Sequence, residues 1–282
     1  MDKKKKAISA IVVVAVLLTG YFIYHHMKWV TTDNAQLQAH SVMIAPKVPG
    51  FIQEVKVEEG QKVEKGDVLA LIDPRDYENA LAIARGELGS VDALLRETEA
   101  NFRRLKDLFQ QGAISHQQYD KALKNYNDAK AKDDALKARV KQAELNLEYT
   151  RIVAPSKGFI AKKSVELGQL AAPGVPLFGF VDSGERWVTA NFKETEIADV
   201  KVGSHVEIEV DAIPGKSYTG KVQSLSSATG ATFTLLPPDN ATGNFTKVVQ
   251  RVPVKIIIEK LTETDVEELR AGLSAIVKVR RE

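Results

Sequence analysis

The sequence predicts an elongated, multi-module protein of mixed α and β structure. We expect an N-terminal transmembrane helix, a β-sandwich split into two halves, an antiparallel coiled-coil α-hairpin between those halves, and a small antiparallel β-barrel. Three observations predict this arrangement. An uncharged run follows a lysine cluster near the N-terminus, apolar residues recur every seven positions in the middle of the chain, and two similar strand-rich segments flank that middle.

Composition and charge exclude several classes of function. The 282 residues carry 39 Lys and Arg against 37 Asp and Glu, and a net charge of +2 gives no reason to expect nucleic acid as a partner. The absence of cysteine excludes disulfides, a thiol nucleophile, cysteine-ligated metal and a lipid on an N-terminal cysteine.

A chain of this length can hold several small modules in a row. We predict these segments: 1–30, cytoplasmic tip and membrane anchor; 31–44, a strand returning to the barrel; 45–73, first sandwich half; 74–150, α-helical hairpin; 151–183, second sandwich half; 184–282, β-barrel.

The N-terminus carries the signals of a membrane anchor. Four lysines precede an uncharged run from Ala7 to Tyr24, and about 18 residues would span about 27 Å as a helix, close to the ~30 Å hydrocarbon core. Tyr21, Tyr24 and Trp29 stand at its far end, where aromatic rings favour the interface. We therefore expect a single-pass protein of the bacterial inner membrane, with its N-terminus in the cytoplasm and its bulk in the periplasm. A cleaved signal peptide is the competing interpretation, but the residues after Tyr24 are bulky and polar.

The middle of the chain has the spacing of a coiled-coil seam and contains no proline between Arg75 and Ala154. The seven-residue repeats are Leu81, Leu88, Leu95, Phe102 and Phe109 in the first half, and Tyr119, Tyr126, Val140 and Leu147 in the second. Gly112 breaks the helix between the halves, and Ser115 can cap the next helix. The sequence thus predicts two antiparallel arms, each about 33 residues and roughly 50 Å long. We interpret Asp133 and Asp134, where the repeat is interrupted, as a solvated pair.

The segments on either side of the hairpin resemble each other. The matching groups are Gly50-Phe51-Ile52 with Gly158-Phe159-Ile160, Gly60-Gln61 with Gly168-Gln169, and Gly66 and Leu69 with Gly174 and Leu177, always offset by 108 residues. A constant offset indicates two copies of one supersecondary unit. Because one such unit buries too little apolar surface alone, we expect the copies to pack into one sandwich, with the hairpin inserted between them.

The polarity of the last third of the chain partly alternates, which predicts a series of short strands. These strands are expected at residues 187–192, 205–210, 218–222, 252–258 and 274–279, and the run 31–43 is expected to add another. Five or six such strands are typical of a small antiparallel barrel.

Two stretches carry a resemblance to a known family: APKVPGFIQEVKVEEGQKVEKGDVLALID and APSKGFIAKKSVELGQLAAPGVPLFGFVD. They resemble the split biotinyl/lipoyl domain of membrane fusion proteins, the HlyD-like periplasmic adaptors. Carriers with this fold hold biotin or lipoate on a lysine at a turn. No such turn joins the halves here, so we expect no covalent cofactor. This resemblance implies a lipoyl-like domain that the α-hairpin interrupts.

Further along the chain, the resemblance is to one group within this family. RWVTANFKETEIADVKVG, YTGKV, LLPPDNATGNFTKVVQRVPVKI and TTDNAQ look like the Emr-type multidrug efflux adaptors, so the resemblance covers most of residues 30–280. It implies an inner-membrane drug transporter of the major facilitator type, a TolC-like outer-membrane channel, and a homo-oligomeric ring, with six copies in many family members. The predicted hairpin is shorter than Emr-type adaptors generally have, and in this it resembles adaptors of another transporter class.

A second family motif falls at the predicted turn of the hairpin. Many adaptors that meet a TolC-like channel carry Arg-x3-Leu-x6-Ser there, and Arg104, Leu108 and Ser115 have that spacing around Gly112. The resemblance implies that these residues contact the channel. Arginine offers a planar fork of donors, leucine an apolar contact and serine a hydroxyl. The alternative is structural: Leu108 in the core, Ser115 as helix cap and Arg104 solvated.

The sequence contains no recognisable catalytic constellation: no His-Glu-x-x-His pair, no phosphate-binding glycine loop and no nucleophile elbow. We interpret His25 and His26 as interfacial residues rather than metal ligands. We therefore expect a non-enzymatic adaptor of a tripartite efflux pump, without metal or cofactor. Three alternatives remain: an adaptor of an ABC-type exporter of proteins or peptides, a membrane-tethered acyl or biotin carrier, and a coiled-coil spacer without a channel.

Overall fold

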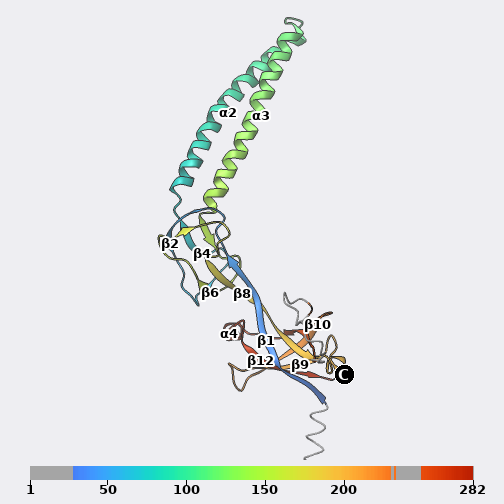
Figure 1. Cartoon of the computed structure of the whole chain (residues 1–282). Helices are drawn as coiled ribbons and strands as arrows, with labels where there is room; N and C mark the ends of the chain where they lie inside the picture. The colour runs from blue at the N-terminus through green and yellow to red at the C-terminus, as the bar shows by residue number, and fades with distance from the viewer. Residues whose placement is uncertain (1–27, 230–231, 233–248, 282) are drawn as a thin grey trace, which may run out of the picture. The chain divides into compact units, whose positions relative to one another are not determined.

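The computed structural model describes residues 28–229, 232 and 249–281, which divide into two compact units (Figure 1). Unit 1 comprises the chain up to Ser41 and from Val181 onward, and unit 2 comprises Val42–Phe180. Within these ranges, no helix has both the length and the apolar character needed to cross a membrane. The predicted anchor from Ala7 to Tyr24 lies outside the described residues.

Unit 1 is built around a closed β-sheet. Its strands are β1 (Trp29–Ile44), β8 (Phe178–Lys193), β9 (His205–Val210), β10 (Ser217–Leu225), β11 (Arg251–Ile258) and β12 (Ser274–Arg280), and the ends of β1 and β8 continue into unit 2. The strand order is β1-β12-β9-β10-β11-β8, and β1 also pairs with β8, which closes the barrel. Buried and more exposed residues alternate along β9 and β12, because successive side chains of a strand point to opposite faces and one face covers the core. The predicted β-barrel is therefore confirmed.

Among the described residues of unit 1, two short helical segments lie between the strands, and the sequence patterns predicted neither of them. They are a 3₁₀ turn at Ile197–Asp199 and helix α4 at Glu263–Glu268. Thr262 caps α4 with its hydroxyl, which accepts from the backbone N–H of Asp265. Leu269 ends the helix fully buried in the barrel core. A helix of six residues is too short to show a 3.6-residue period, which explains why only its capping pattern could have revealed it.

The β part of unit 2 reproduces the internal repeat. Its strands are β2 (Gly50–Val55), β3 (Lys62–Val63), β4 (Val68–Ile72), β5 (Arg151–Val153), β6 (Gly158–Lys163) and β7 (Leu170–Ala171). Strands β2 and β6 start 108 residues apart, as do β3 and β7. The copies exchange their short strands, because β3 pairs with β6 and β7 pairs with β2. Both copies contribute to one core, which includes Ile52, Leu69, Ile160 and Leu177. The predicted duplication is confirmed.

Helices α2 (Arg75–Gln110) and α3 (His116–Glu148) form the rest of unit 2 and run side by side (Figure 1). Their buried apolar residues include Leu81 and Val140 of the predicted repeat. They also include Ala84, Ala122 and Ala129, each three positions after a residue of that repeat. Two ion pairs cross between the helices, Arg85 to Glu144 at 2.8 Å and Glu87 to Arg139 at 2.6 Å. The pairs join an early residue of α2 to a late residue of α3, as antiparallel helices require.

The interpretation of Asp133 as a solvated residue is wrong. Its side chain is turned into the helix pair and the residue is only 1% exposed, whereas Asp134 is exposed. One carboxylate oxygen of Asp133 accepts from Lys137 Nζ at 2.6 Å, and the other has no hydrogen-bond partner among the described residues. Helical geometry places every seventh residue of α3 on the same face, so the carboxylate is buried despite its charge.

Replacing Asp133 with leucine is expected to stabilise the helix pair by about 1 kcal/mol, because apolar residues that replace a buried ion pair are often neutral or favourable. Thermal unfolding of the full-length protein followed by circular dichroism measures the shift. Lys137→Met is the matched variant and should act in the opposite direction, since it leaves the buried carboxylate of Asp133 unpaired. A lower midpoint for Asp133→Leu would show that the carboxylate is required for this pairing.

Candidate partner-binding site

The turn between α2 and α3, here called the tip (residues 104–118), brings together the residues that the sequence singled out. Arg104 and Leu108 lie one helical turn apart on α2 and therefore share a face. The carbonyl of Leu108 accepts a hydrogen bond from the N–H of Ala113 at 2.9 Å. Gly112 adopts φ of +73°, a left-handed conformation that favours glycine and lets the chain reverse. The four predicted residues thus all lie at the tip.

Ser115 has the structural role that the alternative interpretation gave it. Its hydroxyl accepts from the backbone N–H of Gln118 at 3.3 Å, and the Gln118 side chain accepts from the N–H of Ser115 at 3.1 Å. This capping box provides hydrogen-bond acceptors for backbone N–H groups that have no partner within the first turn of α3, and it fixes where that helix begins. A cap leaves the outer side of the turn open, so it is compatible with a contact to a partner.

The other two tip residues present a cation and an apolar surface to solvent. Leu108 is one of the exposed large hydrophobic residues, so it does not belong to the core as the alternative interpretation required. Arg104 is exposed and, in the part of the chain that the structure describes, forms no ion pair. By contrast, its neighbour Arg103 pairs with Glu99 at 2.6 Å. A free guanidinium beside an exposed leucine can bind a partner that offers carboxylates or carbonyl oxygens and an apolar pocket.

Stacked aromatic rings stiffen the hairpin within the tip and next to it. Phe102 stacks on Tyr126 with centroids 5.4 Å apart, and Phe109 stacks on Tyr119 at 4.8 Å. His116 meets the edge of Phe109 at 4.7 Å. The sequence placed the Phe and Tyr residues in the seam but did not predict that they meet across it. Such ring contacts stabilise the hairpin by about 0.5–1.5 kcal/mol per pair beyond the burial of apolar surface, and they hold the two helices together at the tip.

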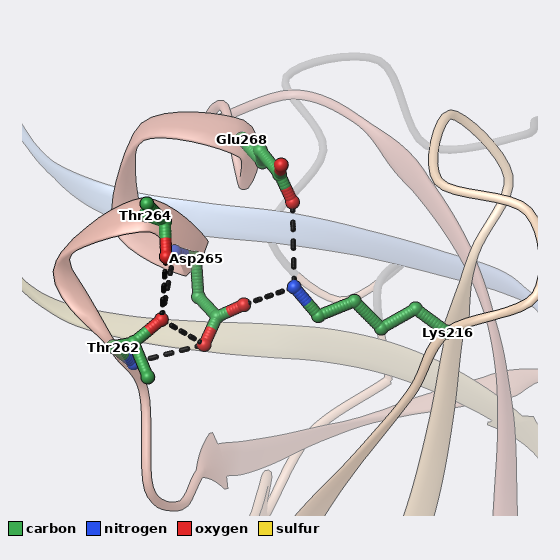
Figure 2. Close-up of polar contacts among 5 residues, drawn as sticks. All are labelled: Lys216, Thr262, Thr264, Asp265 and Glu268. Atoms are coloured by element: carbon green, nitrogen blue, oxygen red, sulfur yellow. Dashed lines mark hydrogen bonds and ion pairs between the residues drawn. The ribbon is translucent and has the colours of Figure 1, made fainter.

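A second cluster of polar contacts lies in unit 1, where Lys216 reaches α4 (Figure 2). Its ammonium contacts Asp265, and Glu268 lies 3.4 Å away. The other carboxylate oxygen of Asp265 accepts from the Thr262 hydroxyl at 2.6 Å and the Thr262 N–H at 2.9 Å. The hydrogen bond from Lys216, and then those from Thr262, hold the pKa of Asp265 well below its usual value, and the same contact raises the pKa of Lys216. The cluster therefore fastens α4 to the start of β10.

The contribution of this cluster to stability should depend on pH. A depressed carboxylate pKa stabilises the fold above the unfolded value of about 3.9, and this stabilisation is lost as the pH falls through the folded pKa. A raised lysine pKa stabilises the fold at pH values below the unfolded pKa of about 10.4. This stabilisation is lost as the pH rises through the folded pKa. Lys216→Met should therefore lower the thermal midpoint most between about pH 5 and 9, with the difference shrinking below about pH 3.

The control for that experiment is Lys221→Met, which removes a more exposed ion pair with Glu259. Exposed ion pairs contribute little to stability, so we expect Lys221→Met to lower the thermal midpoint clearly less than Lys216→Met does. Equal losses for the two variants, or a Lys216→Met difference that does not change with pH, would contradict the assigned role of the cluster.

Two family models match the chain. One is described as "RND MFP, barrel-sandwich hybrid domain", where MFP is membrane fusion protein, and it matches residues 40–183. The other, "CusB-like, beta-barrel domain", matches residues 186–235. The first match covers the duplicated β strands and both helices of unit 2, and the second begins within β8.

Curated relatives and a solved structure agree with these matches. The chain is 30% identical to the colistin resistance protein EmrA of Acinetobacter baumannii, over 95% of this chain and 91% of the relative. It is 31% identical to the multidrug export protein EmrA of Escherichia coli, over 94% and 80%. A structure titled as that of the periplasmic adaptor protein EmrA shares the fold at a TM-score of 0.51 and 21% identity, over 90% of this chain and 99% of that chain. The chain therefore belongs to the membrane fusion protein family and, within it, to the Emr type.

Proposed function

We propose that this protein is the periplasmic adaptor subunit of a tripartite multidrug efflux pump. It would link a drug transporter of the inner membrane to a TolC-like channel of the outer membrane. The observation that carries this proposal is similarity along nearly the whole chain to relatives named for multidrug export and colistin resistance. The role is organisational rather than enzymatic, and the transporter would supply the energy.

Each predicted segment has a part in this role. Residues 1–30 hold the single-pass anchor in the inner membrane, 31–44 and 184–282 form the barrel domain, and 45–73 with 151–183 form the lipoyl-like domain. Residues 74–150 form the coiled-coil arm that carries the tip away from the lipoyl-like domain. The seven-residue repeat and the buried residues between α2 and α3 support this interpretation of the arm.

The tip is the part of the molecule that we assign to the outer-membrane channel. Arg104 supplies a guanidinium free of ion pairs among the described residues, Leu108 supplies exposed apolar surface, and Gly112 and Ser115 shape the turn that presents them. Several copies in a ring would surround the channel entrance. Resemblance to the Emr type favours a major facilitator transporter as the inner-membrane partner.

Cross-linking in intact cells tests the proposed function. Purification through a C-terminal tag, followed by mass spectrometry, should recover a major facilitator transporter and a TolC-like channel, and deletion of the protein should raise drug sensitivity. Recovery of an ABC exporter would retain the adaptor role and change the cargo to proteins or peptides. Recovery of no membrane partner would refute the adaptor role.

A further inference from the structure

The two ends of the barrel in unit 1 differ in charge. Strands β1, β9 and β11 begin at one end, where β8, β10 and β12 finish, and we call residues 28–29, 193–203, 249–251 and 280–281 there the basic end. Six of its side chains are cationic and three are carboxylates: Lys28, Lys193, Lys201, Arg251, Arg280 and Arg281 against Glu194, Glu196 and Asp199. The opposite end, here called the acidic end (residues 182–186, 211–217 and 259–273), has eight carboxylates and four cations.

Most of the positive charge at the basic end is left without a counter-charge. Lys193 Nζ lies 3.7 Å from Glu196, and Arg281 Nε lies 3.5 Å from Asp199. The other four cations form no ion pair among the residues that the structure describes: Lys28, Lys201, Arg251 and Arg280. The basic end therefore offers a surplus of positive charge to a negatively charged partner.

The backbone gathers these charges on one edge of the barrel. Trp29 at the start of β1 pairs with Arg280 at the end of β12. The N–H of Arg281 donates to the carbonyl of Lys28 at 3.0 Å, and the ion pair with Asp199 ties the 3₁₀ turn to the same edge. The surface is thus part of the folded barrel, and its cations are held side by side.

Single apolar side chains project between the charges. Val202 is 65% exposed and lies between Lys201 and Gly203. Gly203 has φ of +91°, and its N–H donates to the carbonyl of Val222 at 2.9 Å, which holds this turn against β10. Val249, just before β11, is 48% exposed. An isolated valine beside a lysine suits the boundary between lipid headgroups and acyl chains.

The predicted anchor brings the basic end close to a lipid surface. The uncharged run ends at Tyr24, four residues before Lys28. An extended chain spans at most about 3.6 Å per residue, so Lys28 lies within about 14 Å of Tyr24. Positive charges act on anionic headgroups within a Debye length, which is about 8 Å at physiological ionic strength. Trp29 follows directly, and aromatic rings favour the interface.

The acidic end is too far from that surface to cancel the attraction. Strand β9 has six residues and runs from one end of the barrel to the other. At about 3.3 Å per residue, the acidic end lies roughly 20 Å further from the anchor, beyond two Debye lengths. The charge difference between the ends therefore orients the barrel with the basic end towards anionic lipid.

The chemistry of the basic end favours a lipid surface over a small anion or a protein. Small molecules bind in concave cavities, and the cavities of about 370–520 Å³ in the described residues are lined by residues outside the basic end. Protein interfaces are centred on clustered anchors that fill pockets, whereas Val202 and Val249 belong to two separate turns. Diffuse positive charge with scattered apolar side chains matches anionic headgroups.

We propose that the basic end of the barrel binds anionic lipid headgroups of the membrane that holds the anchor. Lys201, Arg280 and Lys28 supply the charge, and Val202 enters the headgroup layer. The contact is a second attachment of the chain to the membrane and fixes the orientation of the barrel on it. The inference rests on the anchor in the proposed function and goes beyond it.

Fluorescence quenching in vesicles tests the proposal with the full-length protein. The chain has no cysteine, so Val202→Cys gives a single site for an environment-sensitive dye, and Ala271→Cys gives an exposed control site at the acidic end. A lipid with a nitroxide on its headgroup is the quencher. In vesicles of phosphatidylcholine with phosphatidylglycerol, quenching at position 202 should be at least threefold stronger than at position 271. It should fall at least twofold in phosphatidylcholine alone or in 1 M salt, where the Debye length is about 3 Å.

Charge reversal tests the residues themselves. Lys201→Glu with Arg280→Glu should abolish the difference between the two lipid compositions, and the thermal midpoint should stay unchanged because neither residue forms an ion pair among the described residues. Lys260→Glu with Arg270→Glu is the matched control, since it reverses two cations at the acidic end and should leave the difference intact.

Three results would overturn the proposal. Quenching at position 202 that is equal in the two lipid compositions would show that the anchor alone holds the barrel near the membrane. Equal quenching at positions 202 and 271 would exclude the proposed orientation. In cells, p-benzoylphenylalanine at position 202 with a transporter adduct as its main product would assign this end to a protein.

The vesicles contain neither transporter nor channel, so the outcome is separate from the proposed function. Failure of the full-length protein to float with vesicles of either composition would refute both the anchor and the lipid contact. Lipid-dependent quenching without partner recovery from cells would retain the lipid contact and refute the adaptor role. Recovery of both partners without lipid dependence would refute the lipid contact alone.

Discussion

Cells that carry the Arg104→Asp, Ser115→Arg variant are expected to lose drug export to the level of cells without the protein, although the variant accumulates normally. The reason is that the substitutions exchange charge on the exposed tip and insert a long side chain at the turn. Loss of the Ser115 cap alone costs about 1 kcal/mol at one end of a long helix, so the fold should survive. Drug susceptibility and in-cell cross-linking to the outer-membrane channel measure the effect.

Two controls separate docking from folding at the tip. Arg103→Asp changes the adjacent arginine, which is already paired with Glu99, and should leave export intact. Ser115→Asn keeps a side chain that can cap α3 and should retain most of the export. Full export by the double variant would contradict docking and support the interpretation of the hairpin as a spacer.

Replacing Arg186 with methionine is expected to lower the free energy of unfolding of unit 1 by about 3 kcal/mol, since buried carbonyls would lose a charged donor. Arg186 is 2% exposed, and burial lowers its pKa. Its guanidinium donates to the carbonyl oxygens of Leu269 at 3.2 Å and Asp182 at 2.7 Å. It therefore ties the end of α4 to β8. Urea unfolding of the full-length protein in detergent, followed by tryptophan fluorescence, measures the loss.

Arg270→Met is the matched control for that substitution, because Arg270 follows Leu269 directly and is exposed. Its unfolding midpoint should stay within about 0.5 kcal/mol of the parent protein. Arg186→Lys keeps the charge but has fewer donors, so an intermediate loss is expected. A midpoint for Arg186→Met equal to that of Arg270→Met would show that the carbonyl contacts contribute nothing measurable.

The elements with a long, regular pattern could be predicted from the sequence. The seven-residue repeat predicted both helices, alternation predicted β9 and β12, and the 108-residue offset predicted the duplicated sandwich. Short elements escaped prediction, because α4 has fewer than two turns. The tip residues could be selected only by resemblance, since the spacing of Arg104, Leu108 and Ser115 is equally compatible with a capped, solvated turn.

The sequence by itself determined where the long helices and the regular strands form and which of their apolar positions face a core, because these depend on local periodicity. The tertiary structure decided what those positions meet. It buried Asp133 within the helix pair, brought Phe102 onto Tyr126, and exchanged β3 and β7 between the two copies. Burial against distant residues is a property of the folded chain, and a pattern along the sequence does not name the partner. For the same reason, only the structure showed that Leu167 and Leu170 are exposed beside Phe51.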